Sequence, residues 1–327
     1  MHVRVPIVTT AALCAMALLA PTSSAATPTS CAKPQPSGDT TVAVSAGGTS
    51  RPFLLYVPKG YDGKTPMPLV VNLHGSDGNG SQQMDTSAMR SVADDNGFAV
   101  AAPNGAVQTG TATYRWNVPG VPLVDGTPVP PGTPNDEAYL IAVIAATKRT
   151  VCVDPRRIYM TGYSGGARMT SQMACDRAGA VTAIAPVAGL RAGVPRRAAN
   201  GGWQPDPGTC KPSRAVPVAT FHGTADTVNP YKGSDDPRWG YDVRSALRTW
   251  AALDGCGKAT QRAATTTVDV IDYPKCRNGT RVKLYRANGA GHTWPGPQFP
   301  GLGGIDRSID ASRLMWRFFA KYTLPAR

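Results

Sequence analysis

The chain has 327 residues, of which 42% are hydrophobic and 17% charged, a composition too apolar for a disordered protein. Its 21 acidic residues include a single glutamate, Glu137, which argues against sites built on paired glutamates. The formal net charge is +13, but the basic residues are scattered and their one short cluster, at 148–157, is not interleaved with aromatics. We therefore expect a basic, solvated surface and no nucleic-acid partner.

The first 26 residues are expected to be a secretory signal peptide. Arg4 precedes an apolar run from Val5 to Ala20, and the small residues at 23–26 offer a cleavage site. The run is too short to span a bilayer, so the sequence predicts a secreted, extracellular protein with no membrane partner. An uncleaved N-terminal anchor is the alternative. Residues 27–40 are rich in Pro, Ser and Thr and predict a flexible arm before one folded domain at 41–327.

Within that domain, short apolar runs alternate with longer stretches of helical spacing. Strands are expected at 53–57, 69–73, 98–102, 158–161, 182–187, 216–221 and 282–285, and helices at 136–151, 167–176, 241–253 and 309–322. Such alternation is typical of the α/β class, with a mostly parallel sheet flanked by helices on both faces. The Pro- and Gly-rich stretch 104–135 interrupts the pattern and predicts a loop that walls a functional site.

Six cysteines remain once Cys14 leaves with the signal peptide. An even number in an exported chain indicates disulfides, and no C-x-x-C pair points to zinc or thioredoxin chemistry. Cys256–Cys276 is the favoured pair because both residues flank one short segment. The other two expected pairs, among 15 possible connectivities, are Cys31–Cys152 and Cys175–Cys210.

The clearest chemical motif is G-x-S-x-G at 162–166. It follows an expected strand and opens an expected helix, which is the context that a nucleophilic serine requires. A sharp turn flanked by small residues holds Ser164 above the sheet, and the helix N-terminus favours developing negative charge there. A plain Gly/Ser-rich turn is the structural alternative.

A nucleophilic serine needs a base and an acid. In enzymes whose nucleophilic serine lies in a G-x-S-x-G turn, the chain order is serine, acid, histidine. The histidines after Ser164 are His222 and His292, and these are the candidates for the base. His292 lies in a flexible loop at 289–296 and is the expected base. Asp226, four residues after His222, is the expected acid, whereas Asp254 and Asp272 lie within helix or strand patterns and are the alternatives.

Two further groups complete the expected site. The backbone amides of Ser76, after an apolar strand, and of Gly165, after the serine, would form an oxyanion hole, and the nearby His74 is expected to be a satisfied buried histidine. Three aromatic residues are placed near the site by their neighbours in sequence and would line a substrate pocket, with plain packing as the alternative: Trp116, Tyr163 and Trp294.

Together these motifs (NLHG, GYSGGA, FHGTAD followed by PYKG, and GAGHTWPG) resemble the esterase/poly(3-hydroxybutyrate) depolymerase family. These are secreted α/β-hydrolases, similar also to bacterial feruloyl and acetylxylan esterases. The resemblance runs from about Arg51 to the last helix and matches Ser164, Asp226 and His292 to nucleophile, acid and base. This chain differs from the family pattern at Ser76, where depolymerases often have a cysteine. The polymer-degrading members of the family also carry a linker and a substrate-binding module.

The sequence therefore predicts a secreted serine carboxylic-ester hydrolase that forms an acyl-enzyme on short-chain, feruloyl or acetyl esters. No metal or cofactor is expected, because H-E-x-x-H, H-x-H and Walker A motifs are absent. A monomer is expected, and its positive charge would suit plant cell-wall polysaccharide or polyester oligomers as partners. The alternatives are an extracellular poly(3-hydroxybutyrate) depolymerase, a peptidase on the same fold, and an inactive secreted binding protein.

Overall fold

The computed structural model describes residues 1–3, 31–46, 48–296 and 304–325. By its internal contacts the chain divides into Met1–Ser30 and Cys31–Arg327. Apart from its first three residues, the expected signal peptide at 1–26 lies outside the described part. Among the residues that are described, no helix has the length and apolar character needed to cross a membrane.

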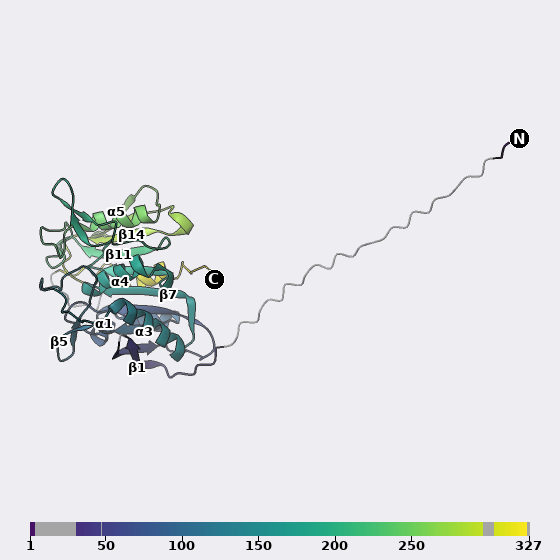
Figure 1. Ribbon diagram of the computed structural model, residues 1–327, viewed down its shortest axis with the longest axis horizontal. Helices are drawn as coiled ribbons and strands as arrows, with labels where there is room; N and C mark the ends of the chain where they lie inside the picture. Colours follow the sequence, from purple (N-terminus) through teal and green to yellow (C-terminus); the bar gives the residue numbers. More distant parts are fainter. Residues whose placement is uncertain (4–30, 47, 297–303, 326–327) are drawn as a thin grey trace. The chain divides into compact units, whose positions relative to one another are not determined.

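One ten-stranded sheet organises the domain, and Figure 1 shows it running from β1 at one edge past β7 and β11 to β14 near the other. Six central strands pair in parallel, and antiparallel strands extend both edges. In spatial order the strands are β1 (Gly38–Ala46), β2 (Thr49–Val57), β4 (Ala99–Pro103), β3 (Met67–Leu73), β7 (Val153–Tyr163), β8 (Ala183–Val187), β11 (Val218–Gly223), β14 (Val282–Ala287), β13 (Val268–Tyr273) and β12 (Thr260–Ala263).

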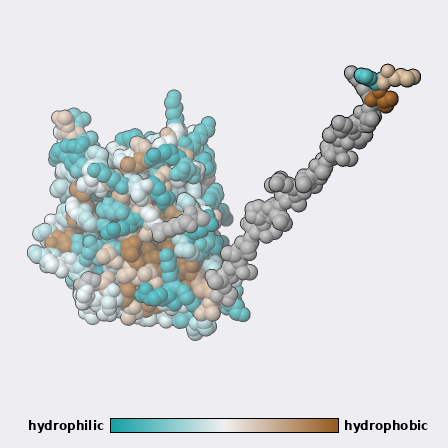
Figure 2. Space-filling view, turned by 45° about the vertical axis from the view of Figure 1, so that its right-hand side comes forward, coloured by the Kyte–Doolittle hydropathy of each residue, from teal (hydrophilic) through white to brown (hydrophobic). Residues whose placement is uncertain are grey.

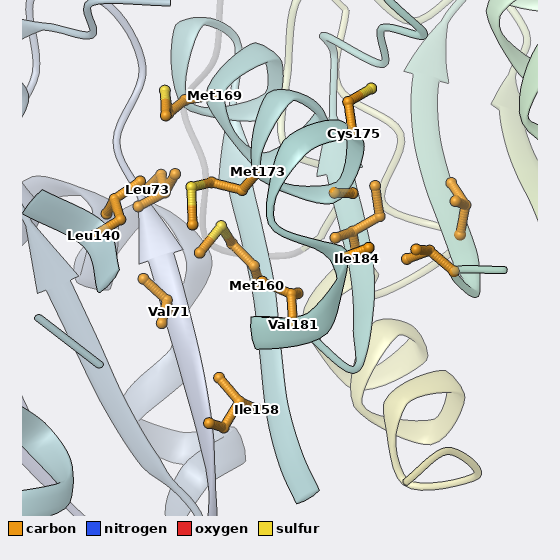
Figure 3. Close-up of a cluster of buried hydrophobic side chains, with 14 of the residues drawn as sticks. Val71, Leu73, Leu140, Ile158, Met160, Met169, Met173, Cys175, Val181 and Ile184 are labelled. Carbon is orange, nitrogen blue, oxygen red and sulfur yellow. The ribbon is translucent and has the colours of Figure 1, made fainter. Parts of the chain in front are cut away.

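Helices cover both faces of the sheet. On β3, Leu69 and Val71 face the layer of α3 (Asp136–Thr150), α4 (Gly165–Asp176) and α5 (Val243–Leu253), whereas Val70 faces the layer of α1 (Gly80–Ser87), α2 (Met89–Asn96) and α6 (Ala311–Phe319). Because successive side chains of a strand alternate between faces, an unbroken apolar strand serves both layers. Figure 3 shows part of the first layer, with Met173 of α4 beside Met160 of β7. The expected α/β architecture is confirmed.

The remaining elements are short. They are the hairpins β5 (Val107–Gly110)–β6 (Thr113–Arg115) and β9 (Pro195–Arg197)–β10 (Trp203–Pro205), and the 3₁₀ turns η1 (Ala178–Ala180) and η2 (Arg277–Gly279).

Figure 2 shows that the face turned to the viewer is largely hydrophilic, with hydrophobic patches gathered near its middle.

The expected elements are all present, with ends shifted by a few residues. β1 begins at Gly38, inside the stretch 27–40 that was expected to be a flexible arm. The described part of that stretch is also tied to the domain, because Lys33 N donates to Gly63 O at 2.9 Å. The stretch 104–135 is a loop that contains the β5–β6 hairpin.

Three disulfides cross-link the domain, in the three pairs expected from the sequence. Their sequence separations are 121, 35 and 20 residues for Cys31–Cys152, Cys175–Cys210 and Cys256–Cys276, respectively. The first attaches the segment before β1 to the start of β7, the second attaches the end of α4 to the stretch before β11, and the third joins the segments after α5 and β13.

Candidate active site

Ser164 lies at the turn between β7 and α4 in a strained backbone conformation. Its φ and ψ are 53° and −113°, a region that costs a residue with a side chain on the order of 1–3 kcal/mol. The turn is held from below, because Ser164 N donates to Val187 O of β8 at 2.9 Å. Strain of this kind is maintained where it positions a functional group, and here the side chain that it positions is a hydroxyl at the N-terminus of a helix.

The glycines of the motif are required by close packing. A Cβ on Gly166 would lie 2.5 Å from the carbonyl oxygens of both Leu73 and His74, and one on Gly162 would lie 2.6 Å from Gly166 O. Both distances are shorter than any real side chain tolerates. The G-x-S-x-G pattern thus lets α4 approach the end of β3 directly beneath the serine.

His292 and Asp226 form a buried pair. His292 Nδ1–H donates to Asp226 Oδ2 at 2.8 Å, and neither side chain is more than slightly exposed. The second carboxylate oxygen accepts from the backbone amides of Val228 and Asn229 at 2.9 and 2.8 Å. The Asp226 carboxylate is therefore fixed in place and holds the imidazole in the tautomer that leaves Nε2 free to accept a proton.

Asp226 has a second histidine neighbour that the sequence did not predict. His222 Nε2 lies 3.2 Å from Asp226 Oδ2 and 2.9 Å from Asn229 O. Burial disfavours the Asp226 carboxylate, but the hydrogen bonds from His222 and His292 outweigh it and lower the pKa of Asp226 below its ordinary range. The His–Gly–Thr–Ala–Asp segment after β11 thus supplies an acid together with a neighbour that keeps it ionised.

The serine and the acid–histidine pair lie at the same edge of the sheet. Ser164, Asp226 and His292 follow β7, β11 and β14, whose carboxyl ends meet at that edge because the strands belong to one parallel array (Figure 1). Tyr163 OH, beside the serine, donates to His292 O at 2.7 Å, and the two rings lie 4.9 Å apart. Tyr163 therefore links the serine turn to the histidine loop, and its place in the pocket wall stays a prediction.

The two expected oxyanion donors are adjacent. A Cβ on Gly165 would lie 3.4 Å from Ser76 N and 2.6 Å from Ser76 Oγ. Among the described residues, no acceptor pairs with the Ser76 amide. An unpaired backbone N–H next to the helix N-terminus can therefore donate to a developing oxyanion.

His74 supports this loop as a neutral, buried residue. Its Nδ1–H donates to Gly75 O at 2.7 Å and its Nε2 accepts from Gly105 N at 3.0 Å. Burial lowers the pKa of His74 to about 4. Trp116 packs on the same imidazole, with ring centroids 4.9 Å apart, and its Nε1–H donates to His74 O at 2.8 Å.

The loop 104–135, which the sequence predicts to wall the site, is anchored by a buried carboxylate. Asp136, at the start of α3, accepts from Asn117 N at 2.8 Å and from Ala106 N at 3.2 Å, and pairs with Arg51 at 2.6 Å. Between this wall and the serine turn lies a cavity of about 10 Å³, close to the room that one water molecule needs. Its lining includes Ser76, Gly165, Trp116, Arg168 and part of the 118–124 stretch.

Trp294 does not lie against this cavity. It is buried in the layer of α1, α2 and α6, where its Nε1–H donates to Ser312 Oγ at 3.0 Å. The expectation that it lines the pocket is therefore replaced by a packing role. Its position two residues after His292 places it close in sequence, but its ring points into the core.

A comparison with protein families matches residues 52–236 to the esterase PHB depolymerase model. The chain belongs to this family. The match covers the serine turn and Asp226 and ends before His292. In the described part of this family member, no group of three or more His, Cys, Asp or Glu side chains is placed to hold a metal ion.

Curated relatives agree with the family, and a solved structure agrees with the fold. The chain is 29% identical to feruloyl esterase B of Piromyces equi over 74% of its length, and 26% identical to the bifunctional acetylxylan esterase/xylanase XynS20E of Neocallimastix patriciarum over 75%. It spans only 42% and 31% of those two proteins. The fold is similar to that of an acetyl xylan esterase from Aspergillus awamori, with a TM-score of 0.51 at 16% identity, covering 78% of this chain and 94% of the other.

Proposed function

We propose that the protein is a secreted serine carboxylic-ester hydrolase in which Ser164 is the nucleophile, His292 the base and Asp226 the acid. The observation that carries this proposal is the strained serine at the same sheet edge as the buried His292–Asp226 pair. Membership of the esterase PHB depolymerase family and the three disulfides support the chemistry and the extracellular location, respectively.

The chemistry is acyl transfer through a covalent intermediate. His292 Nε2 accepts the proton of Ser164 as Oγ attacks the ester carbonyl, and the amides of Ser76 and Gly165 stabilise the oxyanion. Collapse of the tetrahedral intermediate expels the alcohol, which takes the proton from His292. Water, deprotonated by His292, then attacks the acyl-enzyme, and the bond to Ser164 Oγ breaks as His292 returns the proton to that oxygen, which releases the acid. Asp226 stays ionised and stabilises the imidazolium in both halves of the cycle.

We expect small or flat acyl groups, because the side chains next to the oxyanion donors are an aromatic ring, Trp116, and apolar residues of the 118–124 stretch. Feruloyl and acetyl esters offer such groups, and two relatives are named as a feruloyl esterase and an acetylxylan esterase. Short-chain soluble esters are the simplest case. Cell-wall polysaccharide would then present the ester, and poly(3-hydroxybutyrate) is the competing substrate on the family description.

A fluorophosphonate probe followed by peptide mapping tests the chemistry. The adduct should map to Ser164, disappear in Ser164→Ala and persist in Ser76→Ala, because Ser76 contributes only its backbone amide. An unlabelled wild-type protein would indicate an inactive binding protein. Parallel assays of methyl ferulate, short p-nitrophenyl esters and a poly(3-hydroxybutyrate) film then identify the substrate, and rapid clearing of the film without turnover of the soluble esters would favour the depolymerase.

A further inference from the structure

Arg168 is a buried cation beside the site that the proposed chemistry does not use. It lies one turn after Ser164 on α4, and its side chain lines the cavity that Ser76 and Gly165 also line. The residue is 5% exposed, and its Nε and Nη2 are buried without a hydrogen-bond partner. Within the described residues, no carboxylate forms an ion pair with it.

The surroundings of Arg168 favour an anion. Its guanidinium lies 3.8 Å from the ring centroid of Trp239. The positive charges of Arg191 and Arg238 repel it, and the negative charge of Asp236 attracts it. Burial, with repulsion from Arg191 and Arg238, lowers the pKa of Arg168. Asp236 is already engaged by Arg238. Since a guanidinium keeps its proton in proteins, the cluster remains positive. Arg168 has two open donors, Nε and Nη2, and the buried Nε of Arg191 is also without a partner.

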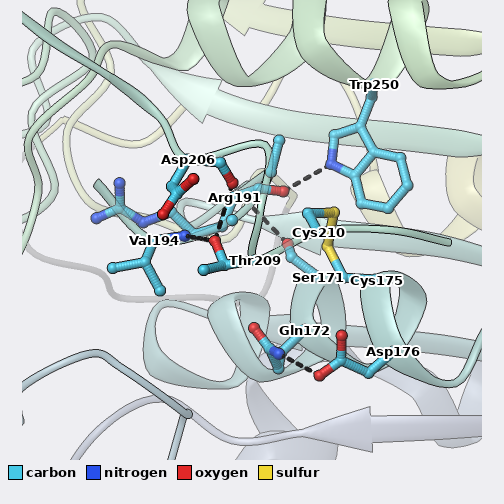
Figure 4. The surroundings of a disulfide bond; sticks show 12 residues. Ser171, Gln172, Cys175, Asp176, Arg191, Val194, Asp206, Thr209, Cys210 and Trp250 are labelled. Atoms are coloured by element: carbon cyan, nitrogen blue, oxygen red, sulfur yellow. Dashed lines mark hydrogen bonds between the residues drawn. A yellow bond between two sulfur atoms is a disulfide. The ribbon is translucent and has the colours of Figure 1, made fainter. Parts of the chain in front are cut away.

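The cluster is held rigidly. Arg191 donates to the carbonyl oxygens of Arg238 and Trp239, and its own backbone accepts from Trp250 Nε1 at 2.6 Å and donates to Ser171 Oγ of α4 at 3.1 Å. Figure 4 shows the contacts of the Arg191 backbone with Trp250 and Ser171, next to the Cys175–Cys210 disulfide. The framework that surrounds Arg168 is therefore fixed to the same helix that carries Ser164 at its start.

We propose that Arg168 binds a carboxylate carried by the ester substrate, close to the scissile carbonyl. A carboxylate would accept from Nε and Nη2 in the bidentate geometry that arginine favours and would neutralise a cation that is otherwise unpaired and buried. The carboxylate can belong to the acyl part, as in a monoester of a dicarboxylic acid, or to the alcohol part, as in an ester of a hydroxy acid. This inference rests on the proposed esterase function.

The cavity must widen to admit such a group, and one of its sides is a loop. Ser76 lies in the loop after β3, and Gly165 and Arg168 lie on α4, whereas the 118–124 stretch supplies most of the remaining lining. That stretch is tied by side chains near its end, through Arg238 to Val124 O and through Arg115 to Asp125 at 2.5 Å. Displacement of this loop opens the cavity without disturbing the serine turn.

The test compares charged and neutral esters of matched shape. For a carboxylate on the acyl side, the charged and neutral substrates are monomethyl and dimethyl succinate. For a carboxylate on the alcohol side, they are 3-acetoxybutyrate and its methyl ester. The rate of ester hydrolysis is measured by pH-stat. In the wild type, kcat/KM for one charged substrate should exceed that of its neutral partner by about 10- to 100-fold, and the pair that shows it identifies the side. Arg168→Met should abolish the ratio, Arg168→Lys should retain part of it, and Arg262→Met, at an exposed arginine on β12, should leave it unchanged.

Binding and stability keep the test independent of turnover. Calorimetry with the same charged esters should detect binding to Ser164→Ala and a loss of at least about tenfold in affinity in Ser164→Ala/Arg168→Met. Arg168→Met should not lower Tm, because it removes an unpaired buried charge. Equal affinities, or an unchanged ratio in Arg168→Met, would overturn the inference even if the neutral esters are hydrolysed. Failure to hydrolyse any ester, with no probe adduct, would instead reject the proposed function, and the calorimetry would still decide the role of Arg168.

Discussion

The buried imidazole of His74 makes stability depend on pH in a calculable way. Its pKa falls from an ordinary value of 6.5 to about 4 in the folded protein because the ring is buried. Between these two values the unfolded chain binds a proton that the folded protein does not bind, so stability is lost as the pH decreases from 6.5 to 4. At 1.36 kcal/mol for each unit of pKa shift, the loss amounts to about 3 kcal/mol.

Urea unfolding of the wild type and His74→Gln between pH 7 and pH 4 measures this contribution. At pH 7 the variant should be less stable, since glutamine does not reproduce both the Gly75 and the Gly105 hydrogen bonds. Glutamine does not titrate, so the difference in unfolding free energy should shrink by about 3 kcal/mol by pH 4. Carboxylates titrate in both proteins, so their contribution cancels from the difference in unfolding free energy. A difference that stays constant over this range would refute the buried neutral imidazole.

Replacing both Cys256 and Cys276 by alanine should lower the free energy of unfolding by about 3 kcal/mol, the chain-entropy value for a 20-residue loop; an unchanged urea midpoint would contradict this. Gly165→Ala should lower kcat about 100-fold or more, because its Cβ would lie 2.6 Å from Ser76 Oγ, and adding Ser76→Gly should restore part of the activity; no recovery would rule out that clash as the cause. Trp294→Phe should lower Tm while kcat/KM is unchanged, since its indole donates within the core, and a selective loss of kcat/KM would return it to the pocket.

The fold was predictable where local pattern and burial agree. Strands such as β3 and β8 are buried along their whole length, so their unbroken apolar runs are visible in the sequence. The exposed edge strand β12, with the sequence TQRA, and the polar helices α1 and α2 carry no such signal. Their conformation depends on pairing with β13 or packing against the sheet, which a single stretch of sequence does not encode.

The candidate site was predictable to the extent that its residues lie in recognisable turns. Ser164 and Asp226 each follow a buried strand, and chain order selected His292. The contact of His222 with Asp226 arises because the turn after β11 folds back on its own strand. Arg168 looks like an ordinary helix residue in sequence, and only the tertiary structure shows that its donors are buried and unpaired. Trp294 was misplaced because nearness in sequence to a histidine does not determine the direction of a side chain.

The central claim, that Ser164 and His292 act as one unit, is tested most directly by a double-mutant cycle. The kcat of Ser164→Ala, of His292→Ala and of the double variant should be measured on one soluble ester, with Tm confirming that each protein is folded. Each single variant should lose on the order of 10⁴- to 10⁶-fold in kcat, and the double variant should lose no more than either alone. Losses that multiply in the double variant, or a His292→Ala protein that retains most of its activity, would contradict the assignment.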